Sequence, residues 1–312
     1  MFNTRQKSYF ALFIICFVWG TTWVISKIVV KEVSVMQLCG MRQLVAGLFM
    51  IIYFTSRGAR LPAKKDWPRL LLMTLLMFIM ANGMSTWGIT YIESGLGAII
   101  GSTTAFWIPV FVYWILGRNV FNAKVITGLV TGIAGIVIIF SEKLGRVTSN
   151  NFIWGIILSL SATIAWSIAT VMAMKKKDSS RLYAETGWQM FMSALVFLPL
   201  AGILGQWTPL NAIPANTWMY IAYLTLAGSI LTFISYVYAI KHLPPAQLAI
   251  YPYINPIVAV LLGLVMLKEP VSTILAFGAL VTLTGVYLVN NGSKRKEKDS
   301  ASVEVAGSGE SL

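Results

Sequence analysis

Polar and aromatic side chains recur at helical spacing in six apolar stretches of this chain. Trp19, Thr22 and Ser26 occupy positions i, i+3 and i+7, which lie on one face of a helix. Polar groups in such apolar surroundings are expected to face protein or a water-filled cavity. The chemistry predicted by these rows is binding through neutral hydrogen bonds and aromatic surfaces. The candidate binding residues are Trp19, Thr22, Asn82, Thr86, Thr104, Trp107, Trp166, Ser229, Tyr236, Tyr251 and Asn255.

Two asparagines carry more weight than the hydroxyls. Ser and Thr can bond to the backbone of their own helix, so a single hydroxyl need not face a ligand. Asn82 and Asn255 lie near the middle of apolar stretches, where an amide has more donors and acceptors than its own helix satisfies. Each could contact a bound solute, or could form a helix–helix hydrogen bond worth about 0.6–2 kcal/mol in a membrane. The sequence leaves both interpretations open.

The aromatic residues divide by depth within the apolar stretches. Tyr251 continues a row with Gln247 and Asn255, whereas Tyr253 lies about 200° away around the helix, so Tyr251 is the predicted cavity residue. Tryptophans near the ends of the stretches favour interfacial anchoring. This second group contains Trp23, Trp67, Trp87, Trp154, Trp207 and Trp218.

Charged and thiol groups predict little further chemistry. Arg42 is the one charge well inside an apolar stretch, where it could contact an anionic group, extend to the surface or brace neighbouring carbonyls. Lys27 lies nearer an end and is expected to be an edge anchor. No acidic residue lies at the middle of a stretch, so no proton relay is visible. Cys16 and Cys39 are expected to be buried free thiols. No catalytic, metal-binding or cofactor-binding residue is predicted, which disfavours an enzyme.

The elements that position these residues are expected to be membrane-spanning helices. The chain has 312 residues, of which 57% are hydrophobic and 11% are charged. Soluble domains carry about 25% charged residues, and about 20 apolar residues suffice to cross a bilayer as a helix. We therefore predict an all-α membrane protein with ten transmembrane helices. The predicted spans are residues 9–30, 35–55, 70–90, 94–117, 123–140, 152–174, 187–205, 217–240, 246–267 and 271–291.

The basic residues predict the orientation of these helices. With the N-terminus inside, eighteen Lys and Arg residues fall on the cytoplasmic side and five on the outer side. This bias places both termini in the cytoplasm, in a multi-pass protein of the inner (plasma) membrane. A nucleic-acid site would need a basic face on a folded soluble domain, so the net charge of +13 does not predict a nucleic-acid partner.

An internal repeat relates the two halves of the chain. At an offset of 147 residues Trp19 falls on Trp166, and at an offset of 150 Gly128 and Gly135 fall on Gly278 and Gly285. Five spans per copy would invert the second copy relative to the first, as in many alternating-access transporters. We predict a first five-helix repeat over 1–147, a second over 148–291 and a disordered cytoplasmic tail over 292–312. The glycines predict close helix packing in the fifth and tenth spans, whose outer faces could also serve a homodimer.

Four segments resemble EamA-type members of the drug/metabolite transporter superfamily. Residues 17–22 read FVWGTT, 239–244 read AIKHLP, 255–258 read NPIV and 267–270 read LKEP. The resemblance implies two inverted five-helix repeats with a cavity lined mainly by the first, third, fourth, sixth, eighth and ninth helices. The first copy has Asn119 where such proteins often carry glutamate, so a symmetric pair of acids is not expected.

The function favoured by these observations is secondary transport of a small-molecule substrate through the lipid bilayer. Amino acids and similar amphipathic solutes suit a neutral cavity of hydroxyls, amides and aromatic rings. Efflux or exchange is the direction implied by the resemblance. A drug efflux carrier and a phosphorylated-metabolite exchanger are the alternatives, and the latter would want more than one buried cation. An intramembrane enzyme and a channel are less consistent with the residues present.

Overall fold

A computed structural model describes residues 3–143, 150–174, 182–243 and 250–309, and the regular structure in these residues is helical. Helix α1 (Thr4–Val29) begins with a capping box, in which Asn3 and Gln6 each accept a hydrogen bond from the other's backbone N–H. Helix α2 (Val35–Ser56) begins at Ser34, whose hydroxyl accepts a hydrogen bond from the backbone N–H of Gln37. These caps satisfy donors that the first helical turn leaves open.

The remaining helices follow the apolar stretches of the sequence. Eight segments are long and apolar enough to cross a membrane, and two shorter apolar helices lie at 123–139 and 251–267. The predicted all-helical membrane class is therefore confirmed. In chain order after α2, the elements are η1 (Lys64–Asp66), α3 (Trp67–Met73), η2 (Thr74–Met84), α4 (Ser85–Tyr91), α5 (Ser94–Ser102), α6 (Thr104–Leu116), α7 (Ala123–Lys143), α8 (Asn150–Met174), α9 (Leu182–Ile203), η3 (Leu210–Ala212), α10 (Ala215–Thr225), η4 (Leu226–Leu231), α11 (Thr232–His242), α13 (Tyr251–Leu267) and α14 (Thr273–Gly309).

Two of the long helical segments change from α-helix to π-helix near their middle. The elements η2 and η4 are π-helical, so each interrupts the α-helix on either side of it. In η4 the hydroxyl of Ser229 donates to the carbonyl oxygen of Leu224, five residues earlier, over 3.1 Å. A wider turn rotates the side chains that follow it relative to α-helical spacing. Rows predicted with a period of 3.6 residues therefore shift within these segments.

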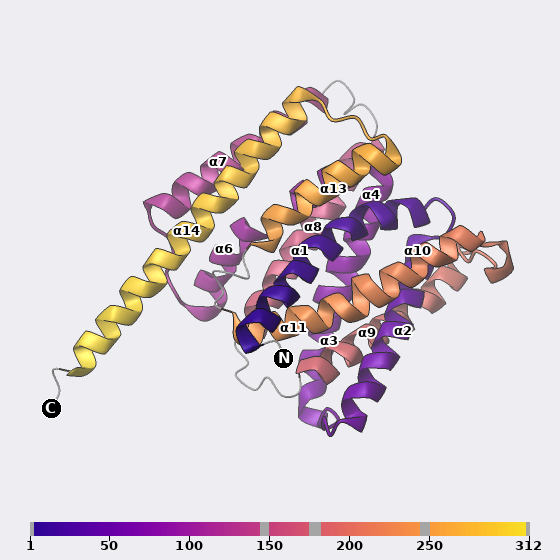
Figure 1. Ribbon diagram of the computed structural model, residues 1–312, viewed down its shortest axis with the longest axis horizontal. Coiled ribbons are helices and arrows are strands. Elements are labelled where there is room, and N and C mark those ends of the chain that lie inside the picture. Colours follow the sequence, from indigo (N-terminus) through magenta and orange to yellow (C-terminus); the bar gives the residue numbers. More distant parts are fainter. Residues whose placement is uncertain (1–2, 144–149, 175–181, 244–249, 310–312) are drawn as a thin grey trace.

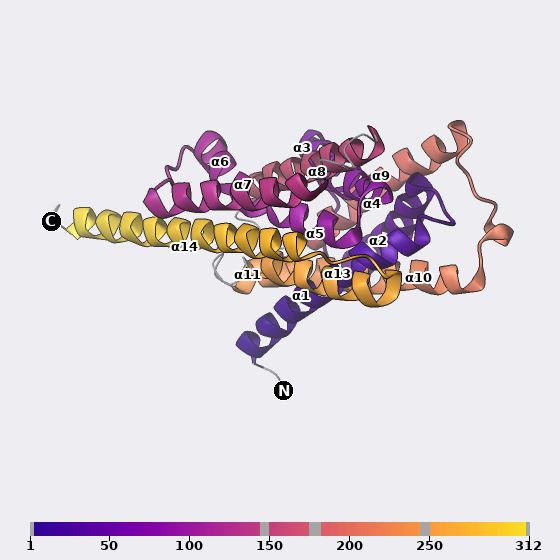
Figure 2. The ribbon, with the colours of Figure 1, turned by 90° about the horizontal axis from the view of Figure 1, so that it is seen from above.

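Glycines bring two pairs of helices together along their length. Helix α7 packs against α14, and α2 packs against α9 (Figures 1 and 2). A Cβ added at Gly128 would lie 2.6 Å from the backbone nitrogen of Val289, and one added at Gly47 would lie 2.6 Å from that of Phe191. Small residues at these points allow the backbones to approach closely. The close packing predicted for the glycines of the fifth and tenth spans is present.

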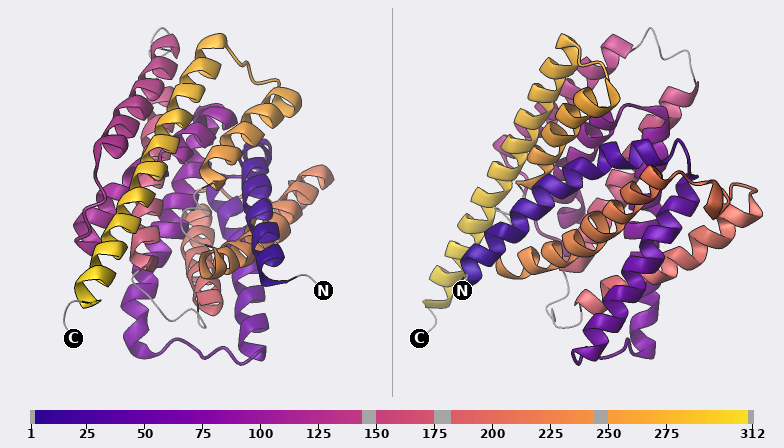
Figure 3. Two further views of the ribbon diagram at one scale, coloured as in Figure 1. Left: turned by 60° about the vertical axis from the view of Figure 1, so that its left-hand side comes forward. Right: turned by 45° about the vertical axis from the view of Figure 1, so that its right-hand side comes forward.

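Helices α1 and α8 each pack against several other helices of the bundle. Helix α1 packs against α13 and α11, while α8 packs against η2, α4 and α6 (Figure 3). In the repeat predicted from the sequence, α1 and α8 are equivalent helices. Both carry the aromatic and hydroxyl rows from which a binding site was predicted.

The C-terminal segment differs from the predicted disordered tail. Helix α14 continues through residues 292–309 and extends beyond the bundle (Figure 1). Residues 294–298 read KRKEK, and Lys, Arg and Glu have good helix propensity. Adding residues to an existing helix also avoids the cost of nucleation. The polar composition indicated solvation, whereas backbone propensity accounts for the helix.

Candidate functional site

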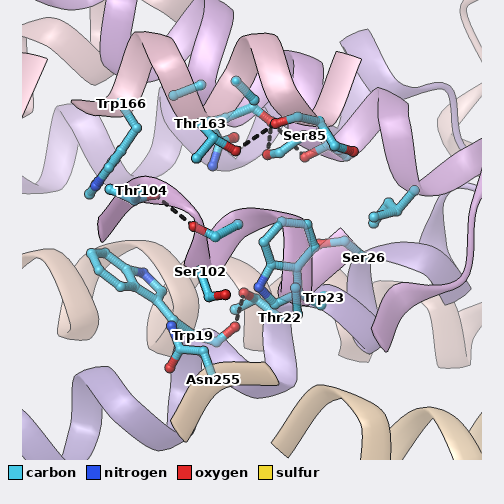
Figure 4. A pocket seen from close by; sticks show the side chains of 18 of the residues that line it. Trp19, Thr22, Trp23, Ser26, Ser85, Ser102, Thr104, Thr163, Trp166 and Asn255 are labelled. Atoms are coloured by element: carbon cyan, nitrogen blue, oxygen red, sulfur yellow. Dashed lines mark hydrogen bonds between the residues drawn. The ribbon is translucent and has the colours of Figure 1, made fainter. Parts of the chain in front are cut away.

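A cavity of 160 Å³ lies between α1, η2, α4, α5, α6, α8, η4, α11 and α13, with one side chain from α2. Figure 4 shows Thr163 and Ser85 on one side of it, and Trp19, Thr22 and Asn255 on the opposite side. The six spans predicted from their polar rows all contribute to its wall. Nine of the predicted residues line the cavity: Trp19, Thr22, Arg42, Asn82, Thr86, Thr104, Trp166, Tyr251 and Asn255.

Three predicted site residues lie outside the cavity lining. Trp107 stacks on Phe111 instead, with ring centroids 6.5 Å apart. Ser229 falls in the π-helical turn, and Gly228 takes the lining position next to it. Tyr236 lies behind Trp19, with ring centroids 5.2 Å apart. The predictions for Ser229 and Tyr236 assumed regular α-helical spacing through the eighth span, which η4 interrupts.

Trp19 is the centre of the aromatic part of the site. Its ring centroid lies 5.5 Å from those of Trp166, Phe233 and Tyr251. The indole Nε1 of Trp166 donates a hydrogen bond to the Tyr251 hydroxyl over 3.3 Å. These contacts hold rings from α1, α8, α11 and α13 in fixed edge-to-face arrangements, which aromatic pairs favour. As predicted, Tyr251 lines the cavity and Tyr253 does not; the Tyr253 hydroxyl accepts a hydrogen bond from Asn290. Gln247 lies outside the described residues.

Four hydroxyls in the lining donate their protons to backbone carbonyls of their own span. Thr22, Ser102 and Thr104 each donate to a carbonyl oxygen three residues earlier, over 2.7 Å. Thr86 donates to the carbonyl oxygen of Asn82 over 2.8 Å. A hydroxyl oxygen retains lone pairs after donating its proton. These four hydroxyls therefore offer acceptors to the cavity, whereas the buried hydroxyl of Ser159, which has no hydrogen-bond partner among the described residues, can also donate.

Both asparagines contact neighbouring helices as well as the cavity. Asn82 accepts a hydrogen bond from the Nε2 of Gln43 over 3.1 Å, and Gln43 in turn accepts one from the Ser193 hydroxyl. Asn255, with its amide nitrogen facing α1, donates to the carbonyl oxygen of Cys16 over 2.6 Å. These amides therefore connect helices, which was one of the two interpretations left open. Gln43 was not singled out from the sequence, although a polar amide well inside an apolar stretch was a signal.

Trp23 is the clearest correction to the predicted site. It was expected to anchor the helix at the membrane interface, but its indole lines the cavity and lies against α5. A Cβ at Gly97 or Gly101 would lie about 3 Å from its ring carbons, so these glycines make room for the indole. Trp23 follows Trp19 by four residues and therefore shares its helix face, a spacing that could have identified it. Cys16 and Cys39 are free and buried, as predicted.

An ion pair joins three helices beside the cavity. The Nζ of Lys27 lies 3.6 Å from a carboxylate oxygen of Glu269, and Lys27 also donates to the backbone carbonyl of Ile92. The Glu269 carboxylate accepts hydrogen bonds from the hydroxyl and backbone N–H of Ser94 at the start of α5. A carboxylate is favourable at a helix N-terminus. Lys27 is thus a bridge between α1, α5 and the end of α13 rather than an edge anchor.

Comparison with known proteins identifies the family of this chain. The model of the EamA-like transporter family matches residues 6–141 and again residues 153–291. This chain therefore belongs to the EamA-like transporter family, and it is a membrane protein with several spans.

Relatives with curated names cover nearly the whole chain. The uncharacterized inner membrane transporter YedA of Escherichia coli is 30% identical over an alignment of 284 residues. The alignment covers 87% of this chain and 87% of YedA. The uncharacterized transporter YvbV of Bacillus subtilis is 27% identical over 303 residues, covering 95% of this chain and 94% of YvbV. A solved crystal structure shares the fold at a TM-score of 0.66 and 15% identity, over 93% of this chain and 98% of that chain.

Proposed function

We propose that this protein is a secondary carrier of small amphipathic metabolites, such as amino acids, and that the cavity is its substrate site. The observation that carries the proposal is a cavity between the helices that is walled by Trp19 and Trp166, the two tryptophans related by the sequence repeat. A site at the interface between repeats is the usual arrangement in alternating-access carriers. The proposed contacts are the lining residues already named.

The proposed mechanism is rocking of two inverted five-helix repeats around this site. Three observations support it: the family model matches once in each half, π-helical turns occur in both the third and the eighth spans, and the pairs α2–α9 and α7–α14 join equivalent helices. With both termini in the cytoplasm, as the basic residues favour, five spans per repeat would give the halves opposite orientations. Outward transport or exchange is the proposed direction.

The lining favours this carrier over the alternatives. Among the described lining residues Arg42 is the one Lys or Arg, which suits a phosphorylated solute poorly. The same lining contains no Asp, Glu, His or Cys, the groups from which intramembrane acid–base or metal catalysis would be built. The volume of 160 Å³ is close to that of an engineered cavity of about 150 Å³ that binds benzene, so it suits small metabolites better than large drugs.

Counterflow in proteoliposomes tests the proposal. Purified protein is reconstituted with a mixture of unlabelled amino acids inside, and labelled amino acids are added outside one at a time. A carrier gives saturable uptake that rises when the inside solute is present. Uptake that is linear with concentration and indifferent to the inside solute would indicate a channel or a leak, and a chemically altered solute would indicate an enzyme.

A further inference from the structure

Arg42 is a buried cation whose surroundings leave its charge uncompensated. Its side chain is 5% exposed and reaches the cavity from α2. One guanidinium nitrogen, Nη2, donates to the Ser229 hydroxyl over 3.3 Å, while its Nε is buried without a hydrogen-bond partner. Within the described residues, the carboxylates found in ion pairs are Glu269 with Lys27 and Glu185 with Arg69. Arg42 therefore neither extends to the membrane surface nor pairs with an acid.

A buried charge is strongly unfavourable unless it is paired and hydrogen-bonded. A planar guanidinium matches a carboxylate with two parallel hydrogen bonds. We propose that Arg42 binds the carboxylate of the transported solute, so that the substrates are small amphipathic molecules with one negatively charged carboxyl group. This inference rests on the proposed carrier function, because it names the chemistry of the solute.

The position of Arg42 fits a short solute. A Cβ added at Gly228 would lie 2.8 Å from the Thr22 methyl carbon and 3.8 Å from Arg42 Nη2, so Thr22 and the guanidinium border the same glycine. Trp19 precedes Thr22 by three residues, a rise of about 4.5 Å along α1. A carboxylate held at Arg42 therefore places the body of a short solute beside the rings of Trp19 and Trp166.

Three hydroxyls of the lining favour a solute with a single negative charge. Thr22, Ser102 and Thr104 donate their protons to backbone carbonyls and thus present acceptor oxygens. Such oxygens suit a solute that also carries N–H groups, but they do not stabilise further anionic oxygens. A phosphate dianion would keep about one charge that Arg42 does not balance. A carboxylate with or without a neighbouring ammonium group satisfies the site.

Binding of matched probes to the purified full-length protein, by calorimetry, tests this inference. The probes are benzoate, L-phenylglycine, benzamide and phenyl phosphate, which separate a carboxylate alone, a carboxylate with ammonium, a neutral group and a dianion. We expect benzoate or phenylglycine to bind at least tenfold more tightly than benzamide and phenyl phosphate. We expect Arg42→Gln to remove this preference, Arg42→Lys to retain part of it, and Lys27→Gln, which changes a cation outside the lining, to leave it intact.

The thermal unfolding of the ligand-free protein separates a binding role from a structural one. Removing an uncompensated charge should leave Arg42→Gln as stable as the unaltered protein or more stable. Carboxylate binding that is absent from the unaltered protein, or equally tight in Arg42→Gln, would overturn the inference. If Arg42→Gln does not fold, benzoate and phenylglycine that bind no more tightly than benzamide to the unaltered protein would overturn it instead.

Counterflow then distinguishes the two proposals. Saturable counterflow of neutral solutes, with carboxylates neither transported nor competing, would support the carrier and reject the role of Arg42. Carboxylate binding that depends on Arg42, without counterflow of any solute class, would support the anion site and reject the carrier.

Discussion

At the scale of residues, the cavity separates two kinds of side chain that the sequence alone cannot separate. Trp19 and Trp166 meet edge to face with centroids 5.5 Å apart and line the cavity, whereas Trp107 stacks on Phe111 outside it. All three are tryptophans within apolar helices and close to hydroxyl rows. Whether an indole lines the cavity depends on the neighbouring helix that its ring contacts, and long-range packing determines that contact. Trp107 is therefore a matched control for testing the role of the Trp166 indole in the site.

Replacing Trp166 by alanine should weaken solute binding, and the same change at Trp107 should not. An aromatic ring in direct contact contributes about 0.5–1.5 kcal/mol beyond the area that it buries. We expect Trp166→Ala to raise the half-saturating solute concentration in counterflow by about tenfold, with Trp107→Ala close to the unaltered protein. Equal effects of the two substitutions, in protein that elutes as a single folded species, would argue against the proposed site.

At the scale of elements, helix packing is easier to predict than the register within a helix. The apolar stretches predicted the helical segments, because length and composition alone make a spanning helix. Glycine spacing predicted close packing in the fifth and tenth spans, because small residues allow helix backbones to approach. That these two spans, α7 and α14, are each other's partners is a finding of the structure. Ser229 and Tyr236 were predicted to line the cavity but lie outside its lining, because η4 adds a π-helical turn. The local composition gives no signal of this turn. Trp23 was misplaced because the space for its indole comes from Gly97 and Gly101 on another helix.

The ion pair of Glu269 allows a prediction at the scale of elements. Its carboxylate both pairs with Lys27 and caps the start of α5, so Glu269→Gln should lower the stability of the protein. Charge-assisted hydrogen bonds of this kind are worth about 1.5–3 kcal/mol each, and the amide oxygen of glutamine retains part of that. We expect a lower thermal unfolding midpoint for Glu269→Gln than for Glu32→Gln, which alters an exposed acid. Identical midpoints would mean that the bridge adds nothing to stability.

At the scale of the whole molecule, the proposed transport requires the two halves of the protein to move around one cavity. The family model matches each half separately, and α1 and α8 contribute equivalent tryptophans to the wall. The packed pairs α2–α9 and α7–α14 each join one helix from either half. Rocking around the cavity should therefore open it to one side of the membrane at a time. The repeat and the charge bias in the sequence predict two inverted halves around one cavity. They do not predict the path that opens on each side of the membrane, because that path depends on contacts between helices.

The most direct test is the accessibility of a cysteine inside the cavity from each side of the membrane. Ser102→Cys places a thiol in the lining, while the native Cys16 and Cys39 are buried and serve as the background. Right-side-out and inside-out vesicles are treated with a membrane-impermeant thiol reagent, with and without a transported solute. We expect Ser102→Cys to react from both sides, and we expect the solute to change the two rates in opposite directions or to protect the thiol from both sides. A thiol that reacts from one side only, under every solute condition, would contradict alternating access around this cavity.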